Sequence, residues 1–324
     1  MGNTKIMVSV IMLTYNHEEF VAEAIESVLN QKVNFNYELL IGDDCSEDHT
    51  VEIIEEYKRH YPNSIRFFPS QENQGTTKNA YRLFLEAKGK YLASCEGDDC
   101  WLDSEKLQRQ VCFLETNLRY IGCSHPVLCV GRQGDTLGSQ KIPWITSKKT
   151  YTIYDFKGVI LPGHSSSLVR RNIFLNSKYD YSIFWKSSKY TGDRVGAVLW
   201  AAQGDFYRLD QVMSCYRCIR GKQEKNVTSI AFMSAQGKSQ READLTKVLE
   251  NYARNELQLD LNFDYYRKRL LVSSVFQCLV RKEYSEWSAI KSLLADMRNP
   301  ILGILSIPIV FLEKVWQKIL LRPF

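Results

Sequence analysis

The chain has 324 residues, 44% of them hydrophobic and 24% charged, which is ordinary for a globular protein and enough for one large domain or two smaller ones. Its net charge of +5 is small, so the composition argues against a nucleic-acid-binding protein. Nine cysteines form an odd, scattered set, which favours reduced thiols in a cytoplasmic protein.

Strands and helices are predicted to alternate along the first 115 residues. Apolar runs rich in β-branched residues predict strands at residues 8–13, 37–42, 65–68 and 91–94. Helical periodicity predicts helices at residues 18–29, 50–61, 77–87 and 104–115. This alternation predicts an α/β fold, with a mostly parallel sheet, right-handed crossovers and flanking helices.

The pattern weakens over residues 121–167 and then resumes. We expect residues 165–169 to form a strand that returns to the sheet, residues 195–202 an apolar helix, and residues 206–218 a further strand. A polar stretch to about residue 240 and long helical patterns follow. We therefore predict an α/β domain over residues 1–221 and a helical region over residues 222–324.

Polar side chains follow three of the predicted strands. Thr14 and Tyr15 follow the first strand, Asp44 follows the second, and residues 96–99 follow the fourth. Parallel sheets collect such loops at the carboxyl ends of their strands, where ligands bind. We expect these loops to form a nucleotide-binding crevice.

Residues 96–99 hold three carboxylates, those of Glu96, Asp98 and Asp99. Carboxylates this close repel one another unless a cation lies among them. A divalent cation with oxygen ligands, Mg²⁺ or Mn²⁺, would relieve the repulsion and leave positions open for a diphosphate. The alternative is a solvated acidic turn.

The residue types suit a site that transfers a sugar from a nucleotide diphosphate. Tyr15 can cover a nucleobase, Asp44 can accept hydrogen bonds from a base or a ribose, and Asp98 can hold ribose hydroxyls. Asp99 can bind the metal. Asp193, at the predicted start of a helix, can act as general base on the acceptor hydroxyl.

Each assignment has a structural alternative. Tyr15 can pack as an ordinary aromatic residue, and Asp44 and Asp193 can cap helices. Lys78 can meet a phosphate or simply be solvated. His164 can line an acceptor pocket.

Three motifs resemble the successive signatures of glycosyltransferase family 2. They are residues 8–16 (VSVIMLTYN), residues 41–48 (IGDDCSED) and residues 95–101 (CEGDDCW). Residues 106–111, Gly192-Asp193 and residues 212–217 extend the resemblance, which covers about residues 5–220. It is strongest to bacterial members that build surface polysaccharide.

The resemblance implies a GT-A fold, a divalent metal and inversion at the anomeric carbon. It matches Asp44 to the base-contacting Asp, Asp98 to the ribose-side Asp, Asp99 to the metal ligand and Asp193 to the general base. Two departures stand out. Glu96 replaces the usual Asp, and Ile219 stands where many members place a His that reaches the metal or the diphosphate. Arg220 can supply positive charge there instead.

The carboxyl-terminal part of the chain predicts contact with a membrane surface. Residues 6–13 are too short for a signal peptide, and no apolar run reaches the roughly 20 residues of a membrane span. Residues 270–280 and 301–321 are apolar with basic flanks, which suits helices lying at the headgroup level. The alternative is packing on the α/β domain or on a second subunit.

We therefore expect a metal-dependent inverting glycosyltransferase, peripheral on the cytoplasmic face of the cell membrane. Its donor is a nucleotide sugar, expected to be a UDP-sugar, and its acceptor a glycan, expected to be lipid-linked. One alternative is a sugar nucleotidyltransferase, but a Gly-rich phosphate loop is missing after the first strand. The other is a nucleotide-sugar-binding scaffold without activity.

Overall fold

The computed structural model describes residues 5–137, 142–176, 178–219, 238–280, 282–284 and 286–312. The strands are β1 (Ile6–Thr14), β2 (Asn36–Asp43), β3 (Ile65–Pro69), β4 (Tyr91–Ser94), β5 (Tyr120–Ser124), β6 (Val127–Val130), β7 (Thr150–Tyr151), β8 (Val169–Arg171), β9 (Asp205–Arg208) and β10 (Ser214–Arg217). The α-helices are α1 (Val21–Leu29), α2 (Thr50–His60), α3 (Thr76–Glu86), α4 (Lys106–Thr116), α5 (Ile183–Lys186), α6 (Gly192–Ala201), α7 (Lys238–Asn255), α8 (Asp264–Val280), α9 (Glu286–Asp296) and α10 (Pro300–Leu305).

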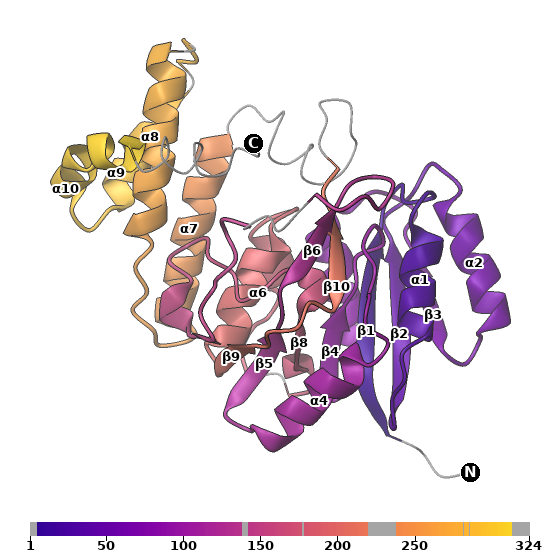
Figure 1. Ribbon diagram of the computed structural model, residues 1–324. Coiled ribbons are helices and arrows are strands. Elements are labelled where there is room, and N and C mark those ends of the chain that lie inside the picture. The colour runs from indigo at the N-terminus through magenta and orange to yellow at the C-terminus, as the bar shows by residue number, and fades with distance from the viewer. Residues whose placement is uncertain are drawn as a thin grey trace.

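The main sheet has the strand order β3-β2-β1-β4-β8-β5-β9-β7 (Figure 1). β3, β2, β1 and β4 are parallel, whereas β8 is antiparallel to its neighbours β4 and β5. The four strands and four helices predicted up to residue 116 are all present, within about three residues at each end. The predicted α/β class is therefore confirmed.

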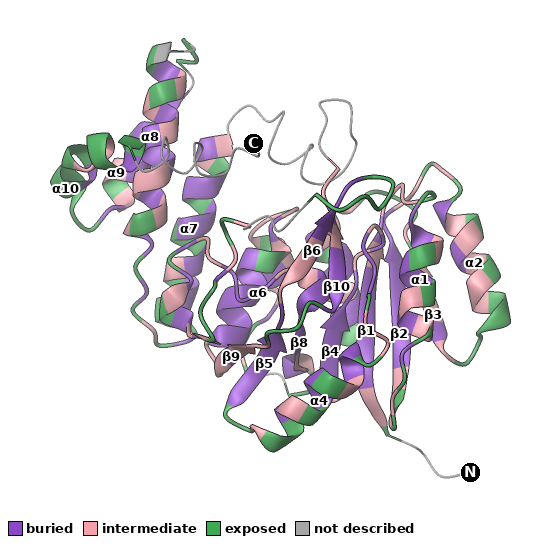
Figure 2. Cartoon of the chain, viewed as in Figure 1, coloured by how far each residue is buried: buried purple, intermediate pink, exposed green. Residues whose placement is uncertain are grey.

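The two faces of the sheet bury alternate residues of β1. Val10 and Met12 pack with α1, α2 and α4 in one core, whereas Ile11 packs with α3, α6 and α7 in the other. Because both faces are covered, β1 is apolar almost throughout, as expected for a central parallel strand. Figure 2 shows the buried central strands between the half-exposed helices.

The single strand predicted at residues 206–218 is in fact two strands in two different sheets. Residues 205–208 form β9 in the main sheet, and residues 214–217 form β10, which pairs with β6 in a separate two-stranded sheet. The exposed residues 210–212 lie between them. The predicted strand at residues 165–169 is also shifted, because residues 165–167 form a 3₁₀ turn and β8 begins at Val169.

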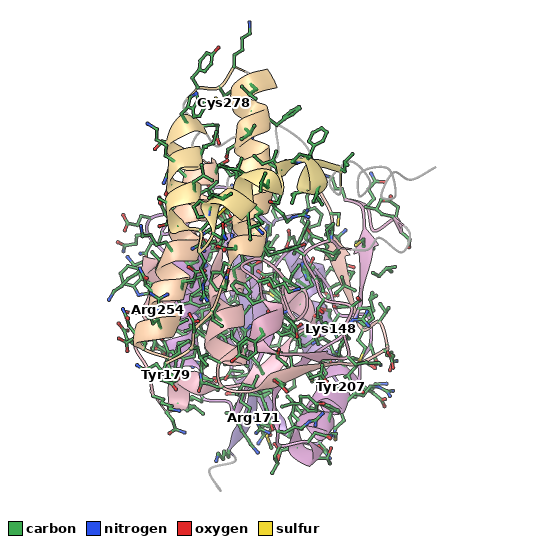
Figure 3. The ribbon with its side chains drawn as sticks, turned by 90° about the vertical axis from the view of Figure 1, so that its left-hand side faces the viewer. Lys148, Arg171, Tyr179, Tyr207, Arg254 and Cys278 are labelled. Atoms are coloured by element: carbon green, nitrogen blue, oxygen red, sulfur yellow. The ribbon has the colours of Figure 1, made fainter. Side chains whose placement is uncertain are left out.

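The helical region divides between two cores. α7 contributes Leu245 and Leu249 to the core that also contains Trp200 of α6, while α8, α9 and the start of α7 share a separate core. Part of the apolar run of α8 therefore packs inside the helical region, since Leu270 and Leu271 are buried. Figure 3 shows Cys278 of α8 at the opposite end of the molecule from Arg171 of β8.

The predicted boundary near residue 222 and the residues 313–321 of the predicted membrane tail lie outside the described residues. Among the helices that the structure describes, none is both long enough and apolar enough to cross a bilayer.

Lys106, the first residue of α4, is fully buried beneath the acidic loop. Its Nζ lies 4.1 Å from the ring centroid of Trp101 and has no hydrogen-bond partner. Burial lowers the pKa of Lys106 from 10.5 to about 7, because the charged form loses its hydration. The folded protein therefore holds this ammonium at a cost in stability.

We expect Lys106→Met to increase the free energy of unfolding by about 2 kcal/mol at pH 6. Between pH 7 and pH 10.5 the unfolded chain binds more protons than the folded one, so wild-type stability rises with pH in this window. The difference in free energy of unfolding between Lys106→Met and the wild type should therefore shrink as the pH rises. Urea unfolding from pH 6 to pH 10 measures this, with the exposed Lys88→Met as control. A constant difference between variant and wild type would contradict it.

Candidate active site

The candidate site lies where β2, β1 and β4 end, because these adjacent parallel strands bring their following loops together. The amide of Asp44 donates to the carbonyl of Thr14 at 3.0 Å, and the amide of Gly97 donates to the carbonyl of Leu13 at 3.0 Å. The three polar loops are thus held to one another by backbone hydrogen bonds.

Asp44 is buried and joins the loop after β2 to the start of α3. Its Oδ1 and Oδ2 accept hydrogen bonds from the amides of Gln74 and Gly75, both at 2.8 Å. Burial raises its pKa, and these two amides oppose the rise, as does Lys189. Asp44 therefore helps to hold the loop before α3.

Thr14 and Tyr15 lie beside this carboxylate. Thr14 is buried and donates from Oγ1 to Oδ2 of Asp43 at 2.9 Å. Tyr15 is half-buried, and its pKa is raised by burial, by Glu47 and, to a smaller extent, by Asp44. A half-exposed ring next to a buried carboxylate suits a nucleobase contact.

The lysine that acts on Asp44 in the structure is Lys189, whereas Lys78, which was predicted to meet a phosphate or to be solvated, is exposed. Lys78 is exposed on α3, with Nζ 5.7 Å from the ring centroid of Trp185. Lys189 instead acts electrostatically on Asp44 and packs over Gly75. Lys189 lies in a segment without a recognisable motif, so no sequence pattern pointed to it. Arg220 lies outside the described residues.

Asp99 is buried behind the acidic loop, and both of its oxygens are engaged. Oδ2 accepts from Oγ of Ser166 at 2.5 Å, and Oδ1 accepts from the amide of Arg217 at 2.9 Å. Burial raises the pKa of Asp99 well above its usual range, and Asp98 raises it further. Ser166 and Arg217 are two hydrogen-bond partners of Asp99 to which we assigned no role from the sequence.

Asp98 is the more accessible carboxylate of the pair. Its side chain is 27% exposed, and its Oδ2 lies 3.9 Å from Nε2 of His17. It faces a depression of about 200 Å³, which Tyr15, Arg132 and Ile219 also line. Asp98 is thus open to a ligand, whereas Asp99 supports the loop from behind.

His164 lies beside Asp99. Its Nδ1 accepts from the amide of Ser166 at 3.3 Å and lies 3.5 Å from Oδ2 of Asp99, and its ring centroid is 4.2 Å from that of Tyr216. Burial lowers the pKa of His164 to about 4, so the imidazole is neutral at pH 7. The structure therefore places His164 next to the acidic loop.

Asp193 occupies the first turn of α6, as predicted. Its Oδ1 accepts from the amide of Arg194 at 2.8 Å. The side chain reaches solvent, yet the protein surrounding it removes enough water to raise its pKa. A carboxylate that is reachable and more basic than usual suits a general base.

Glu96 connects the acidic loop with Asp193. Burial raises the pKa of Glu96 to about 7, with further contributions from the negative charges of Asp98 and Asp193. The buried Arg170 of β8, another residue that the sequence did not single out, opposes this rise. The charges of Asp98 and Asp193 therefore both act on Glu96, from the acidic loop and from the first turn of α6.

A mostly parallel sheet with acidic loops at its strand ends and helices on both faces is the GT-A architecture. The family model of glycosyl transferase family 2 matches residues 9–176, just over half of the chain. The chain belongs to glycosyltransferase family 2.

Two curated relatives come from Bacillus subtilis (strain 168). EpsE, provisionally named a glycosyltransferase, is 37% identical over 118 residues, 36% of this chain and 42% of EpsE. The minor teichoic acid biosynthesis protein GgaA is 28% identical over 215 residues, 62% of this chain and 46% of GgaA. The chain thus spans less than half the length of these relatives.

A solved structure supports the fold. Residues 1–349 of TarS from S. aureus, in complex with UDP-GlcNAc, superpose with a TM-score of 0.62 over 89% of this chain and 81% of that one. The sequences are 16% identical, so this likeness concerns the fold.

Proposed function

We propose that the chain is an inverting glycosyltransferase that moves a sugar from a UDP-sugar to a glycan acceptor in bacterial surface polysaccharide synthesis. Two observations carry this proposal: the loops that bear Asp44 and Asp98 are hydrogen-bonded to the end of β1, and the charges of Asp98 and Asp193 both act on Glu96. Membership of family 2 and the names of EpsE and GgaA support the reaction class and the polymer. The UDP-GlcNAc bound by TarS supports the choice of donor.

The roles of the residues follow from their surroundings. Tyr15 covers the nucleobase, with Thr14 and Asp44 holding the loops around it. Glu96 and Asp98 face the ribose and the diphosphate. Asp193 accepts the proton of the acceptor hydroxyl as that oxygen attacks the anomeric carbon and the nucleotide diphosphate departs.

The acidic loop fits a divalent cation. Oδ2 of Asp99 and Nδ1 of His164 both accept hydrogen bonds, yet they lie only 3.5 Å apart, an arrangement that nearby positive charge stabilises. Within the described part of the chain, no three His, Cys, Asp or Glu side chains are grouped to hold a metal. From the sequence we expected Asp99 to bind the metal, but both of its oxygens accept hydrogen bonds from Ser166 and Arg217. Asp98, which is 27% exposed, would instead hold Mg²⁺ or Mn²⁺ together with phosphate oxygens and water. The cation supplies positive charge against the departing diphosphate.

A lipid-linked acceptor at a membrane surface is the finer part of the proposal. α10 exposes a row of large apolar side chains, and Ile301, Ile304 and Leu305 are each more than half exposed. No acidic or basic residue interrupts the chain between Pro300 and Leu312. Such a surface suits the boundary between lipid headgroups and acyl chains.

The experiment that tests the function is a transfer assay with a panel of nucleotide sugars, with Mn²⁺ or with EDTA. We expect release of UDP that requires both the cation and an acceptor, and faster transfer when the acceptor is carried in anionic vesicles than when it is free. Nucleotide-sugar binding without transfer to any acceptor would favour the scaffold alternative. Release of a nucleoside monophosphate or pyrophosphate would favour a nucleotidyltransferase.

A further inference from the structure

We propose that Glu242 of α7 and Tyr266 of α8 are positioning residues that hold the general base Asp193 through Arg194. The proposal rests on the function proposed above for Asp193. In this proposal α7 and α8 of the helical region help to position the general base.

Arg194 links the base to the helical region. Its amide donates to Oδ1 of Asp193 at 2.8 Å, while its guanidinium points into the protein and is buried. There Nη1 is paired with Oε2 of Glu242, and both residues are only 5% exposed. A buried ion pair with a single geometry fixes the position of the backbone that carries it.

The other two nitrogens of the guanidinium also donate hydrogen bonds. Nε and Nη2 donate to the carbonyl of Gly158, at 3.1 and 2.8 Å. Gly158 has a φ of +91°, and a Cβ there would lie 2.9 Å from Cβ of Tyr266. The carbonyl therefore depends on a glycine that packs directly against α8.

Tyr266 completes the enclosure of Arg194. Its hydroxyl donates to Oε2 of Glu242 at 2.6 Å, and its ring centroid lies 4.7 Å from Cζ of Arg194. Glu242 thus accepts from two partners on two elements. Movement of α7 or α8 would be transmitted to the first turn of α6, which carries the base.

The same groups set the electrostatic surroundings of Asp193. Arg194 lowers the pKa of Asp193, and Glu242 raises it. Glu96 faces Asp193 from the acidic loop, while Lys238 and Arg269 act on Glu242 and Tyr266 from α7 and α8. Removing the charge of Glu242 leaves Arg194 unopposed, so the pKa of Asp193 should fall.

The test is Glu242→Gln in the full chain, measured for transfer rate against pH and for the carboxyl ¹³C shift of Asp193 against pH. We expect kcat to fall about tenfold with the KM of the donor unchanged, since the base is misplaced but the nucleotide site is intact. The acidic limb of the rate profile and the NMR midpoint should both move to lower pH.

Glu250→Gln is the matched control. Glu250 also lies on α7 and also pairs with a buried arginine, Arg267, at 2.6 Å, but it has no contact with Arg194 among the described contacts. Its loss should lower thermal stability without moving the acidic limb or the NMR midpoint. An unchanged midpoint in Glu242→Gln, or an equal shift in Glu250→Gln, would overturn the proposal.

Two further measurements keep the outcome clear. If Glu242→Gln does not fold, Tyr266→Phe keeps the ring over Arg194 and removes one hydrogen bond to Glu242. It should lower kcat at least twofold with donor KM unchanged, and an unchanged kcat would count against the proposal.

Because the NMR midpoint requires no turnover, an inactive wild-type protein would overturn the proposed function and still leave the positioning of Asp193 tested.

Discussion

Asp193→Asn should lower kcat by about a thousandfold while the affinity for UDP stays within about twofold of the wild type. Asparagine has the same size and can still accept the hydrogen bond from the amide of Arg194, so the first turn of α6 should be kept. It has no basic oxygen, and the acceptor hydroxyl then keeps its proton. Steady-state transfer rates and calorimetric binding of UDP measure the two quantities.

The pH dependence of the wild type should agree with this role. Asp193 accepts a proton only when it is ionised, and the protein around it raises its pKa. The rate should therefore fall on the acidic side at a higher pH than an ordinary Asp would give. Asp210→Asn, at an exposed site where the carboxylate pairs with Lys149, is the control and should leave the rate unchanged. A normal rate in Asp193→Asn would rule out this base.

The second large effect is expected for Asp98→Asn, which should lower kcat/KM for the donor by about a hundredfold or more. Asp98 is more accessible than Asp99 in the acidic loop, and the substitution removes the negative charge that attracts a cation. Asp99 remains buried and bonded to Ser166 and Arg217, so the loop itself should keep its shape.

The measurement is the donor dependence of the rate at several concentrations of Mn²⁺. The variant should need far more Mn²⁺ to reach half of its own maximal rate. Glu105→Gln removes an exposed carboxylate at the start of α4, where it pairs with Arg109, and should behave like the wild type. If Asp98→Asn had the same requirement for Mn²⁺ as the wild type, Asp98 would not hold the cation.

The sequence was most informative where structure depends on local periodicity. The strands at residues 8–13 and 37–42 are apolar because both of their faces are covered, and they are also where the structure places β1 and β2. Their parallel order follows from the helices between them. The meeting of Thr14, Asp44 and Asp98 could therefore be expected from chain order alone.

The parts that the sequence did not reveal depend on contacts between distant segments. Residues 206–218 have a continuous β-rich composition, so the sequence does not show where one strand ends and the next begins. In the structure β9 pairs with β5 in the main sheet, and β10 pairs with β6 in the second sheet. Ser166 reaches Asp99 across 67 positions, and Glu242 reaches Arg194 across 48. No local sequence pattern predicts these pairs, because the two residues come together only when their helices and strands pack in the folded protein.

Of the two apolar runs predicted to face a membrane, residues 301–305 in α10 are largely exposed, whereas residues 270–280 are not uniformly so. We expected residues 270–280 to contribute to the membrane-facing surface, but much of that run is buried inside the helical region. Hydropathy along the chain cannot distinguish an apolar run that packs against neighbouring helices from one that faces outward. The exposed residues of α10 carry the proposal instead.

The most direct test of the proposed site is calorimetric titration of the wild-type protein with UDP, once with Mn²⁺ and once with EDTA. Carboxylates gathered at the strand ends should bind the negatively charged diphosphate well only when a cation offsets their charge. We predict at least tenfold tighter binding with Mn²⁺, and loss of that difference in Asp98→Asn. Equal affinity for UDP in Mn²⁺ and in EDTA would contradict a cation-bridged diphosphate site.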